Sequence, residues 1–123
     1  MTQRTNAREI VLLDEVVLIA TGTHEFRGLP PLWGINPRFV LVLSDLTAGA
    51  GASLELNIEH SMDGTNVFDL YAGFAASAEG AYRAYTEDLA TRYPFARLRA
   101  NVTTFADITS VTATLLGFFD KGN

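Results

Sequence analysis

Two histidines are the residues of this 123-residue chain best suited to acid–base chemistry, because an imidazole titrates close to neutral pH. His60 ends an alternating segment, and His24 lies between Thr23 and Glu25. Neither belongs to a motif that supplies a nucleophile or an orienting partner. We therefore expect two solvent-exposed histidines at strand ends, and we predict that the chain is not an enzyme and has no catalytic residue.

Four acidic residues, Glu55, Glu59, Asp63 and Asp69, are the next candidates, since paired carboxylates serve glycosidases and grouped ones bind calcium. The spacing of the two glutamates is that of any solvated strand face, and the sequence around Asp63 lacks the D-x-D-x-D-G pattern of a calcium loop. Asp63 beside Gly64 is typical of a tight turn. The chain has no cysteine, which excludes disulfides and thiolate zinc sites. We predict no metal and no cofactor.

Large apolar residues in a proline-containing loop are candidates for protein binding. The segment Gly28-Leu29-Pro30-Pro31-Leu32-Trp33-Gly34 cannot be regular structure, because adjacent prolines fix φ and remove donors. Leu32 and Trp33 either anchor an interface or plug the end of the domain. Phe118 and Phe119 point to opposite faces of a strand, so one is exposed unless a neighbour covers it. Leu32, Trp33 and Phe119 are therefore predicted interface residues.

Two arginines extend this set of interface candidates. Arg97 and Arg99 share the polar face of one alternating segment, while Glu55 and Glu59 share the polar face of another. If the two strands are neighbours, the charges form cross-strand pairs worth roughly 0.2–1 kcal/mol each. If they are not, Arg97 and Arg99 are available to a partner.

The elements that must position these residues are mostly β-strands, as period-two alternation indicates. Residues 53–72 are predicted to form a hairpin around the Asp-Gly turn. Residues 95–116 are predicted to form a second hairpin, with its turn at Ala106-Asp107. Their threonine-rich outer faces favour strands over helices.

The remaining segments complete an all-β architecture. Residues 39–43 form an apolar run typical of a strand covered on both faces, and residues 12–20 indicate one or two early strands. Residues 48–52 are predicted to be a flexible turn between strands. Alternation over residues 82–87 favours a short strand over a helix within the ambiguous region 75–93. We predict an antiparallel, jelly-roll-like β-sandwich of about seven to eight strands.

Length and composition fit one domain, predicted over residues 9–120, with a flexible N-terminal arm at residues 1–8. The net charge is −5 and no window is strongly basic, so nucleic acid is not an expected partner. The apolar stretch at residues 10–20 contains two acidic residues and is far shorter than the roughly 20 residues of a membrane span. We expect no membrane partner and no signal peptide.

One pair of segments resembles known structural proteins. The turn His60-Ser61-Met62-Asp63-Gly64-Thr65-Asn66 is followed by Tyr93-Pro94-Phe95-Ala96-Arg97-Leu98-Arg99. This is similar to bacteriophage structural proteins and discoidin-like sandwiches, in which a strand ends in S-x-D-G and a later strand reads aromatic, small, then R-h-R. The resemblance covers residues 53–116. It implies a jelly roll on a virion, decorating or cementing the shell, with a capsid or tail protein as partner and self-association into a homo-oligomer.

The sequence therefore favours a structural virion protein, made in the host cytoplasm and located in the virion. The alternative is a carbohydrate-binding module, in which exposed aromatic rings stack on sugars. Its stacking residues would be Trp33, Tyr82, Tyr85 or Tyr93.

Overall fold

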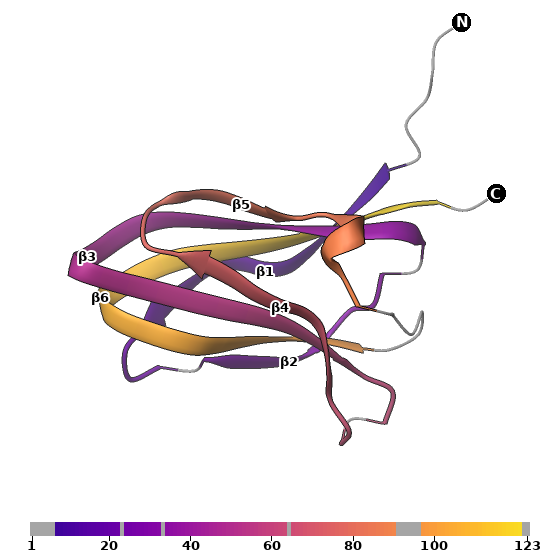
Figure 1. Ribbon diagram of the computed structural model, residues 1–123, viewed down its shortest axis with the longest axis horizontal. Helices are drawn as coiled ribbons and strands as arrows, with labels where there is room; N and C mark the ends of the chain where they lie inside the picture. The colour runs from indigo at the N-terminus through magenta and orange to yellow at the C-terminus, as the bar shows by residue number, and fades with distance from the viewer. Residues whose placement is uncertain (1–6, 23, 33, 64, 91–96, 122–123) are drawn as a thin grey trace, which may run out of the picture.

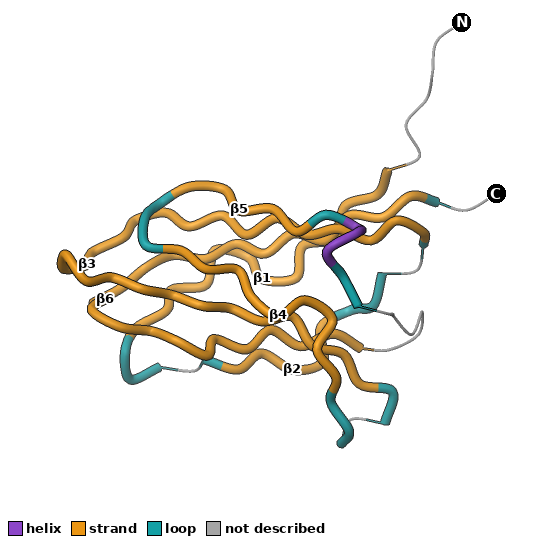
Figure 2. The backbone as a smooth tube through the Cα atoms, in the orientation of Figure 1, coloured by secondary structure: helices purple, strands orange, loops and turns teal. Residues whose placement is uncertain are grey.

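Strands account for almost all of the computed structural model, which describes residues 7–22, 24–32, 34–63, 65–90 and 97–121 (Figure 1). The sole helix among these residues is the short 3-10 turn η1 (Figure 2). No helix of the described chain is long and apolar enough to cross a membrane. The elements are β1 (Ala7–Ile19), β2 (Glu25–Leu29), β3 (Ile35–Ser61), β4 (Phe68–Ala76), β5 (Gly80–Ala84), η1 (Thr86–Asp88) and β6 (Arg97–Asp120).

Two very long strands, β3 and β6, organise the fold. They pair antiparallel from Ile35 opposite Asp120 to Ser61 opposite Arg97, and both bend midway (Figure 1). Before the bend β3 also pairs with β5, and after it with β4. The second half of β6 pairs with β1, and the first half pairs with β2.

The result is two packed layers. One, the β1/β5 sheet, has the order β1, β6, β3, β5, and the other, the β2/β4 sheet, has the order β2, β6, β3, β4. Counting each half of β3 and β6, the described residues form eight strand segments that wind between the layers as in a jelly roll. The predicted all-β antiparallel sandwich is confirmed.

The bend of both strands is a corner that positions the two layers. Its pairing register shifts repeatedly between residues 44 and 56 of β3, and Asp45 and Asp107 have positive φ values of 50° and 54°. The Gly51 N–H donates a hydrogen bond to Oδ2 of Asp107 at 2.7 Å. A Cβ on Gly49 would lie 2.4 Å from the Asp107 carboxylate oxygens, so a larger residue there requires this carboxylate to move away from the Gly51 N–H.

This corner corrects two predictions. Residues 48–52 are not a turn between separate strands, because β3 continues through them. Residues 95–116 are not a hairpin, because both halves of β6 pair with β3 and not with each other. The signal at Ala106-Asp107 comes from a bulge with one left-handed residue, which resembles turn chemistry in sequence.

The structure contains two other predicted elements, the hairpin at residues 53–72 and a short strand within residues 75–93. The hairpin at residues 53–72 is confirmed, with Leu54 opposite Ala76 and His60 opposite Phe68. The short strand predicted over residues 82–87 is present as β5 but ends at Ala84, and Thr86–Asp88 form the helix η1 instead. Strand β1 begins at Ala7, inside the range expected for the N-terminal arm, while residues 1–6 lie outside the described residues.

The core lies between the layers and is built from inward rows of side chains. Leu41 and Leu115 are partners in one such row and are fully buried. The other half of residues 39–43 differs from expectation, because Val40 and Val42 face outward and are only half-buried. Cover on both faces was therefore a wrong expectation for this strand, at least within the chain itself.

Candidate interaction surfaces

The outward face of the β1/β5 sheet is unusually apolar. Strand pairing places Val11, Leu116, Val40 and Arg83 side by side in one row across all four strands. Members of one row point to the same face, and the alternate rows are buried, so this row faces outward. Three of its four side chains are aliphatic, and Val11 is 48% exposed.

Rows on either side extend this surface, which we call the apolar face. Phe118 lies between Glu9 and Arg38, and Val17, which is 62% exposed, lies beside Thr112. The complete outward set is Glu9, Val11, Val17, Ile19, Arg38, Val40, Val42, Ser44, Ala81, Arg83, Ser110, Thr112, Thr114, Leu116 and Phe118. A hollow of about 330 Å³ beside β5 is lined partly by Val40, Phe118 and Arg83.

Charge on the apolar face sits at its margins. Arg38 Nη2 forms an ion pair with Oδ1 of Asp120 at 3.1 Å. A hydrogen bond from Asn36, followed by the contact with Arg38, lowers the pKa of Asp120 despite some opposing desolvation. Because Arg38 is neutralised, the unbalanced charges of the outward set are Glu9 on β1 and Arg83 on β5.

The outward face of the β2/β4 sheet, here called the charged face, is polar throughout its centre. Arg99 lies opposite Glu59, and Glu59 lies opposite Asp69. Arg99 forms ion pairs with Glu25 of β2 and with Glu59, the latter at 4.0 Å between Nε and Oε1. Arg27 also pairs with Glu25. Of the cross-strand pairs that neighbouring strands would allow, Arg99 with Glu59 is present, whereas Arg97 lies opposite Ser61 and Glu55 lies opposite Thr104.

The pKa values of the two glutamates beside Arg99 are shifted in opposite directions. A hydrogen bond from Arg27 and the nearby positive charges lower the pKa of Glu25. Burial raises the pKa of Glu59, because the cost of desolvating its carboxylate exceeds the attraction of Arg99. The 4.0 Å ion pair of Glu59 is thus a weak contact, and Glu25 is the stronger partner of Arg99.

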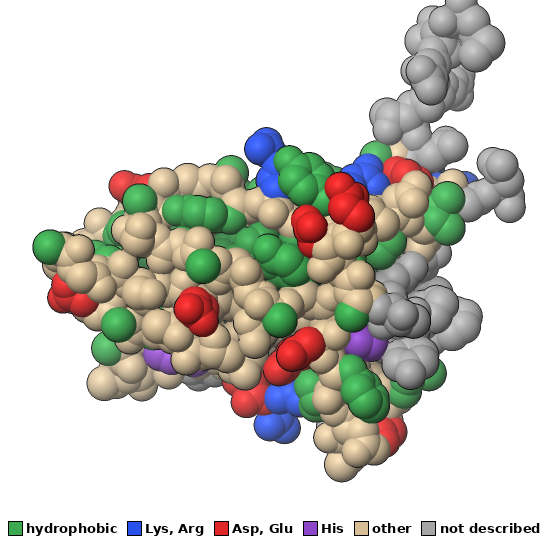
Figure 3. Space-filling view, in the orientation of Figure 1, with side chains coloured by type: hydrophobic (Ala, Val, Ile, Leu, Met, Phe, Trp, Pro, Cys, Tyr) green, Lys and Arg blue, Asp and Glu red, His purple; other side chains and the backbone are tan. Residues whose placement is uncertain are grey.

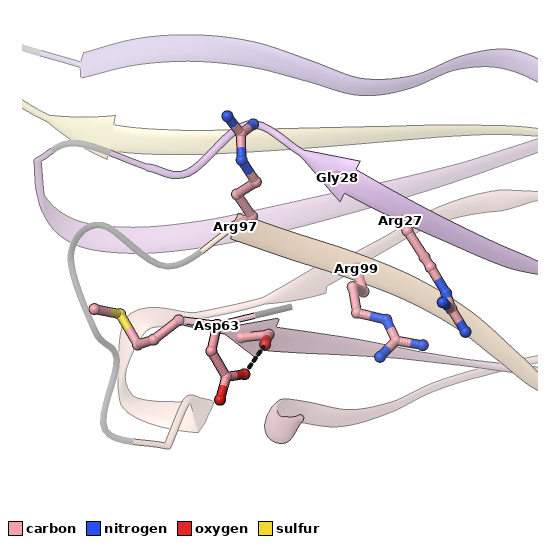
Figure 4. A pocket seen from close by; sticks show the side chains of 7 residues that line it. Arg27, Gly28, Asp63, Arg97 and Arg99 are labelled. Carbon is pink, nitrogen blue, oxygen red and sulfur yellow. Dashed lines mark hydrogen bonds between the residues drawn. The ribbon is translucent and has the colours of Figure 1, made fainter. Parts of the chain in front are cut away.

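A cleft of about 390 Å³ opens at the end of the charged face (Figure 4). Arg27 and Arg99 extend toward the same side, whereas Arg97 points away from them. Asp63 accepts hydrogen bonds from the backbone N–H groups at 65 and 66 at 2.8 and 2.7 Å, which lower its pKa to about 2. The turn role predicted for Asp63 is confirmed. The lining of the cleft has three arginines and one carboxylate, that of Asp63, and two of the arginines, Arg27 and Arg99, form ion pairs with Glu25.

A third surface is a tyrosine-lined groove of about 380 Å³ between β4 and β5. Hydrophobic side chains gather there in the space-filling view (Figure 3). Tyr71 packs edge-on against Phe74 with ring centroids 4.8 Å apart, and the Tyr82 hydroxyl donates to the carbonyl of Ala78 at 2.6 Å. Tyr85, which is 53% exposed, completes the aromatic lining.

The predicted interface residues lie in different environments. Leu32 is 1% exposed, so its side chain belongs to the core of the chain itself. Trp33 lies outside the described residues. Phe119 is half-buried against the core. Arg97 and Arg99 both line the cleft, although Arg99 is also held by Glu25. Their roles in binding stay predictions.

Sequence reasoning missed the apolar face, and it misplaced one histidine. His60 is 1% exposed, so the expectation of a solvent-exposed residue is wrong. His24 is half-buried and its ring is tilted by 39° against that of Phe105, with ring centroids 4.8 Å apart, while its Nε2 lies 2.9 Å from the carbonyl oxygen of Ile19. The signal that could have found the apolar face is the unbroken apolar run at residues 39–43. Within the described chain, no three acidic or histidine side chains are grouped so that they could hold a metal.

The fold of this chain is similar to that of chains in solved virus structures, at low sequence identity. A structure of infectious bursal disease virus Gx strain matches with 17% identity and a TM-score of 0.48, over 98% of this chain and 33% of that one. The infectious bursal disease virus VP2 subviral particle matches with 16% identity and a TM-score of 0.45, over 98% and 34%. This chain thus spans about a third of those chains.

No protein-family model matches the chain, and no curated protein matches it.

Proposed function

We propose that this chain is a structural component of a virion that assembles with other particle proteins through protein–protein contacts. The observation that carries the proposal is the apolar face of the β1/β5 sheet. An antiparallel sandwich in water normally has polar outward faces, as the charged face here has. An apolar strip across three adjacent strands, ending at Arg83 on β5, instead resembles a contact surface. Jelly rolls are also common in viral capsids, which agrees with this role without requiring it.

The sequence resemblance to bacteriophage structural proteins extends the proposal to a more specific role. The chain would decorate or cement a capsid, or serve as a head or tail accessory, after synthesis in the host cytoplasm. Its partner would be a capsid or tail protein of the same particle. We assign the contact to the apolar face and not to the loop containing Leu32, because the Leu32 side chain is buried in the core.

The test is to purify particles of the virus or phage whose genome encodes this chain and to quantify the chain by mass spectrometry. We expect a fixed copy number per particle that survives nuclease treatment. We also expect Val40→Asp to reduce incorporation, because a buried unpaired carboxylate opposes docking. Thr103→Asp, at an exposed position of the β2/β4 sheet, serves as the matched control and should be incorporated normally. Absence of the chain from particles, despite its presence in infected cells, would contradict the proposal.

A carbohydrate-binding module is the second candidate, favoured by the tyrosine-lined groove. Exposed aromatic rings bind the C–H faces of sugars through apolar contact, and Arg83 beside them supplies hydrogen-bond donors. We expect Tyr85→Ala to abolish any signal on a glycan array if this function is real. Phe68→Ala is the control, because Phe68 is an exposed aromatic residue outside the groove. A glycan array without hits for the unmodified chain excludes the sugars displayed and counts against this candidate.

A further inference from the structure

We propose that the apolar face binds the same face of a second copy of this chain, with a twofold axis that runs along the strands. This inference deepens the proposed function, on which its biological meaning rests, by naming the partner of that surface. Two features of the apolar face support it: its aliphatic centre, and the placement of opposite charges on its opposite edges.

The aliphatic centre fits a self-complementary contact. Leu116 on β6 and Val40 on β3 occupy the middle of the four-stranded row, with Val11 and Arg83 outside them. A rotation of 180° about an axis along the strands, placed between β6 and β3, reverses the strand order and leaves each row level with itself. Leu116 of one copy then meets Val40 of the other, so aliphatic groups face aliphatic groups.

The charges at the edges of the apolar face favour a twofold axis along the strands over one that runs across them. On the β1 edge the charge of the outward set is the acidic Glu9, whereas Arg8 lies in the alternate row opposite Phe119, and the bulge adds exposed Asp14 and Glu15. The opposite edge, β5, presents exposed Arg83. The axis along the strands brings the β1 edge of each copy over the β5 edge of the other, which places Arg83 near Glu9. An axis across the strands would instead place β1 over β1 and oppose like charges.

Open-edge pairing through β1 is a less suitable way to join two copies. The strand contains register shifts between Val11 and Val16, and Glu15 has a positive φ of 47°. Bulges and charges of this kind interrupt the row of backbone donors and acceptors that an added strand would need. The face of the sheet, and not its edge, is therefore the surface that a second copy fits.

The size of the apolar face determines how tightly two copies are expected to bind each other. Four strands about 4.8 Å apart and about eight residues long present roughly 500 Å² as a flat surface, which is below the roughly 800 Å² per partner of a standard interface. We therefore expect a weak dimer in isolation, which becomes appreciable only at high protein concentration or when copies are held together on a particle.

The experiment is sedimentation equilibrium of the full chain at concentrations up to about 1 mM. We expect a monomer–dimer equilibrium that Arg83→Glu weakens about tenfold or more, since it opposes like charges. Glu9→Arg alone should weaken it similarly, and the double variant should restore it to within about threefold. Glu55→Arg, at an exposed position of the charged face, should leave the equilibrium unchanged. Circular dichroism establishes that each variant is folded.

Three results would overturn this interface: a strict monomer throughout the concentration range, a dimer insensitive to both charge reversals, or a double variant no better than the singles. These failures are distinct from failure of the proposed function. If the chain is found in purified particles yet shows no such equilibrium, the virion role stands and the self-contact is wrong. If it dimerises as described but is absent from particles, the self-contact stands and the virion role is wrong.

Discussion

The two outward faces of this sandwich share the strands β3 and β6, yet the centre of one face is charged and the centre of the other is aliphatic. On the charged face, Arg99 lies among Glu25, Glu59 and Asp69. On the apolar face, corresponding central positions hold Leu116 and Val40. The halves of β3 and β6 in the β2/β4 sheet therefore alternate polar and apolar residues, whereas their halves in the β1/β5 sheet carry apolar residues at several outward positions as well, among them Val40 and Leu116.

This difference shows that the fold alone does not explain the apolar face. Inward leucines are sufficient to hold the layers together, as the alternating pattern at residues 54–60 demonstrates. Aliphatic residues at the outward positions add nothing to that core, and they leave apolar surface in water at a cost of about 25 cal/mol per Å² relative to burial. A partner that covers the face recovers this free energy.

The corner between the layers is where we expect a substitution to have the largest effect, because the bend there determines which residues belong to which face. We expect Gly49→Ala to lower the free energy of unfolding by about 1–3 kcal/mol, since a Cβ there collides with the Asp107 carboxylate. Urea unfolding monitored by circular dichroism measures the loss.

A double-mutant cycle identifies the cause of that loss. Asp107→Gly removes the carboxylate while tolerating the positive φ at this position. In that background Gly49→Ala should cost less than half as much. Equal losses in both backgrounds would show that the carboxylate is not what excludes a side chain from residue 49.

The corner also explains what the sequence could and could not predict. Alternation at residues 54–60 and the turn around Asp63 predicted the β3–β4 hairpin, because both signals are local. The Asp107 bulge has the same local signal as a turn, and only its pairing with β3 distinguishes a bend from a reversal. The burial of His60 likewise depends on the opposite layer, which no local pattern contains.

The candidate surfaces were predictable only in part. The partnership of Arg99 with Glu59 followed from alternation once the strands were assumed to be neighbours. Its stronger partner Glu25 belongs to β2, a five-residue strand whose sequence has no clear period. The apolar face required the register of four strands to bring Val11, Leu116 and Val40 into one row.

Arginine substitutions on the two faces should differ in their effect on stability. Arg99→Met removes the partner of Glu59, and the side chains of both residues are only 15% exposed. We expect a loss of about 1–3 kcal/mol in the free energy of unfolding, because a partly buried carboxylate is left without its counter-charge. Arg83→Met, on the apolar face, should change stability by no more than about 0.5 kcal/mol. Similar losses for both variants would mean that the charged face is not held together by Arg99.

The smallest expected effect is a pH dependence that separates the two glutamates beside Arg99. The folded-state pKa of Glu25 is lowered, so its carboxylate stabilises the fold above its ordinary pKa of 4.5, and this contribution fades as the pH falls through the lowered value. Glu25→Gln should therefore be less stable than the unmodified chain at neutral pH, with a difference that shrinks in acid. Urea midpoints between about pH 3 and pH 7 measure it.

Glu59→Gln should behave in the opposite way. The folded-state pKa of Glu59 is raised, so the unmodified chain loses stability as the pH rises above 4.5 through that raised value. At neutral pH the glutamine variant should be at least as stable as the unmodified chain. As the pH falls toward 4.5, the free energy of unfolding of the unmodified chain should rise relative to that of the variant. If both variants instead lose stability at neutral pH with the same pH profile, then Arg99 is shared equally between the two carboxylates. The charged face would then be held by both ion pairs, and Glu25 would have no special place in it.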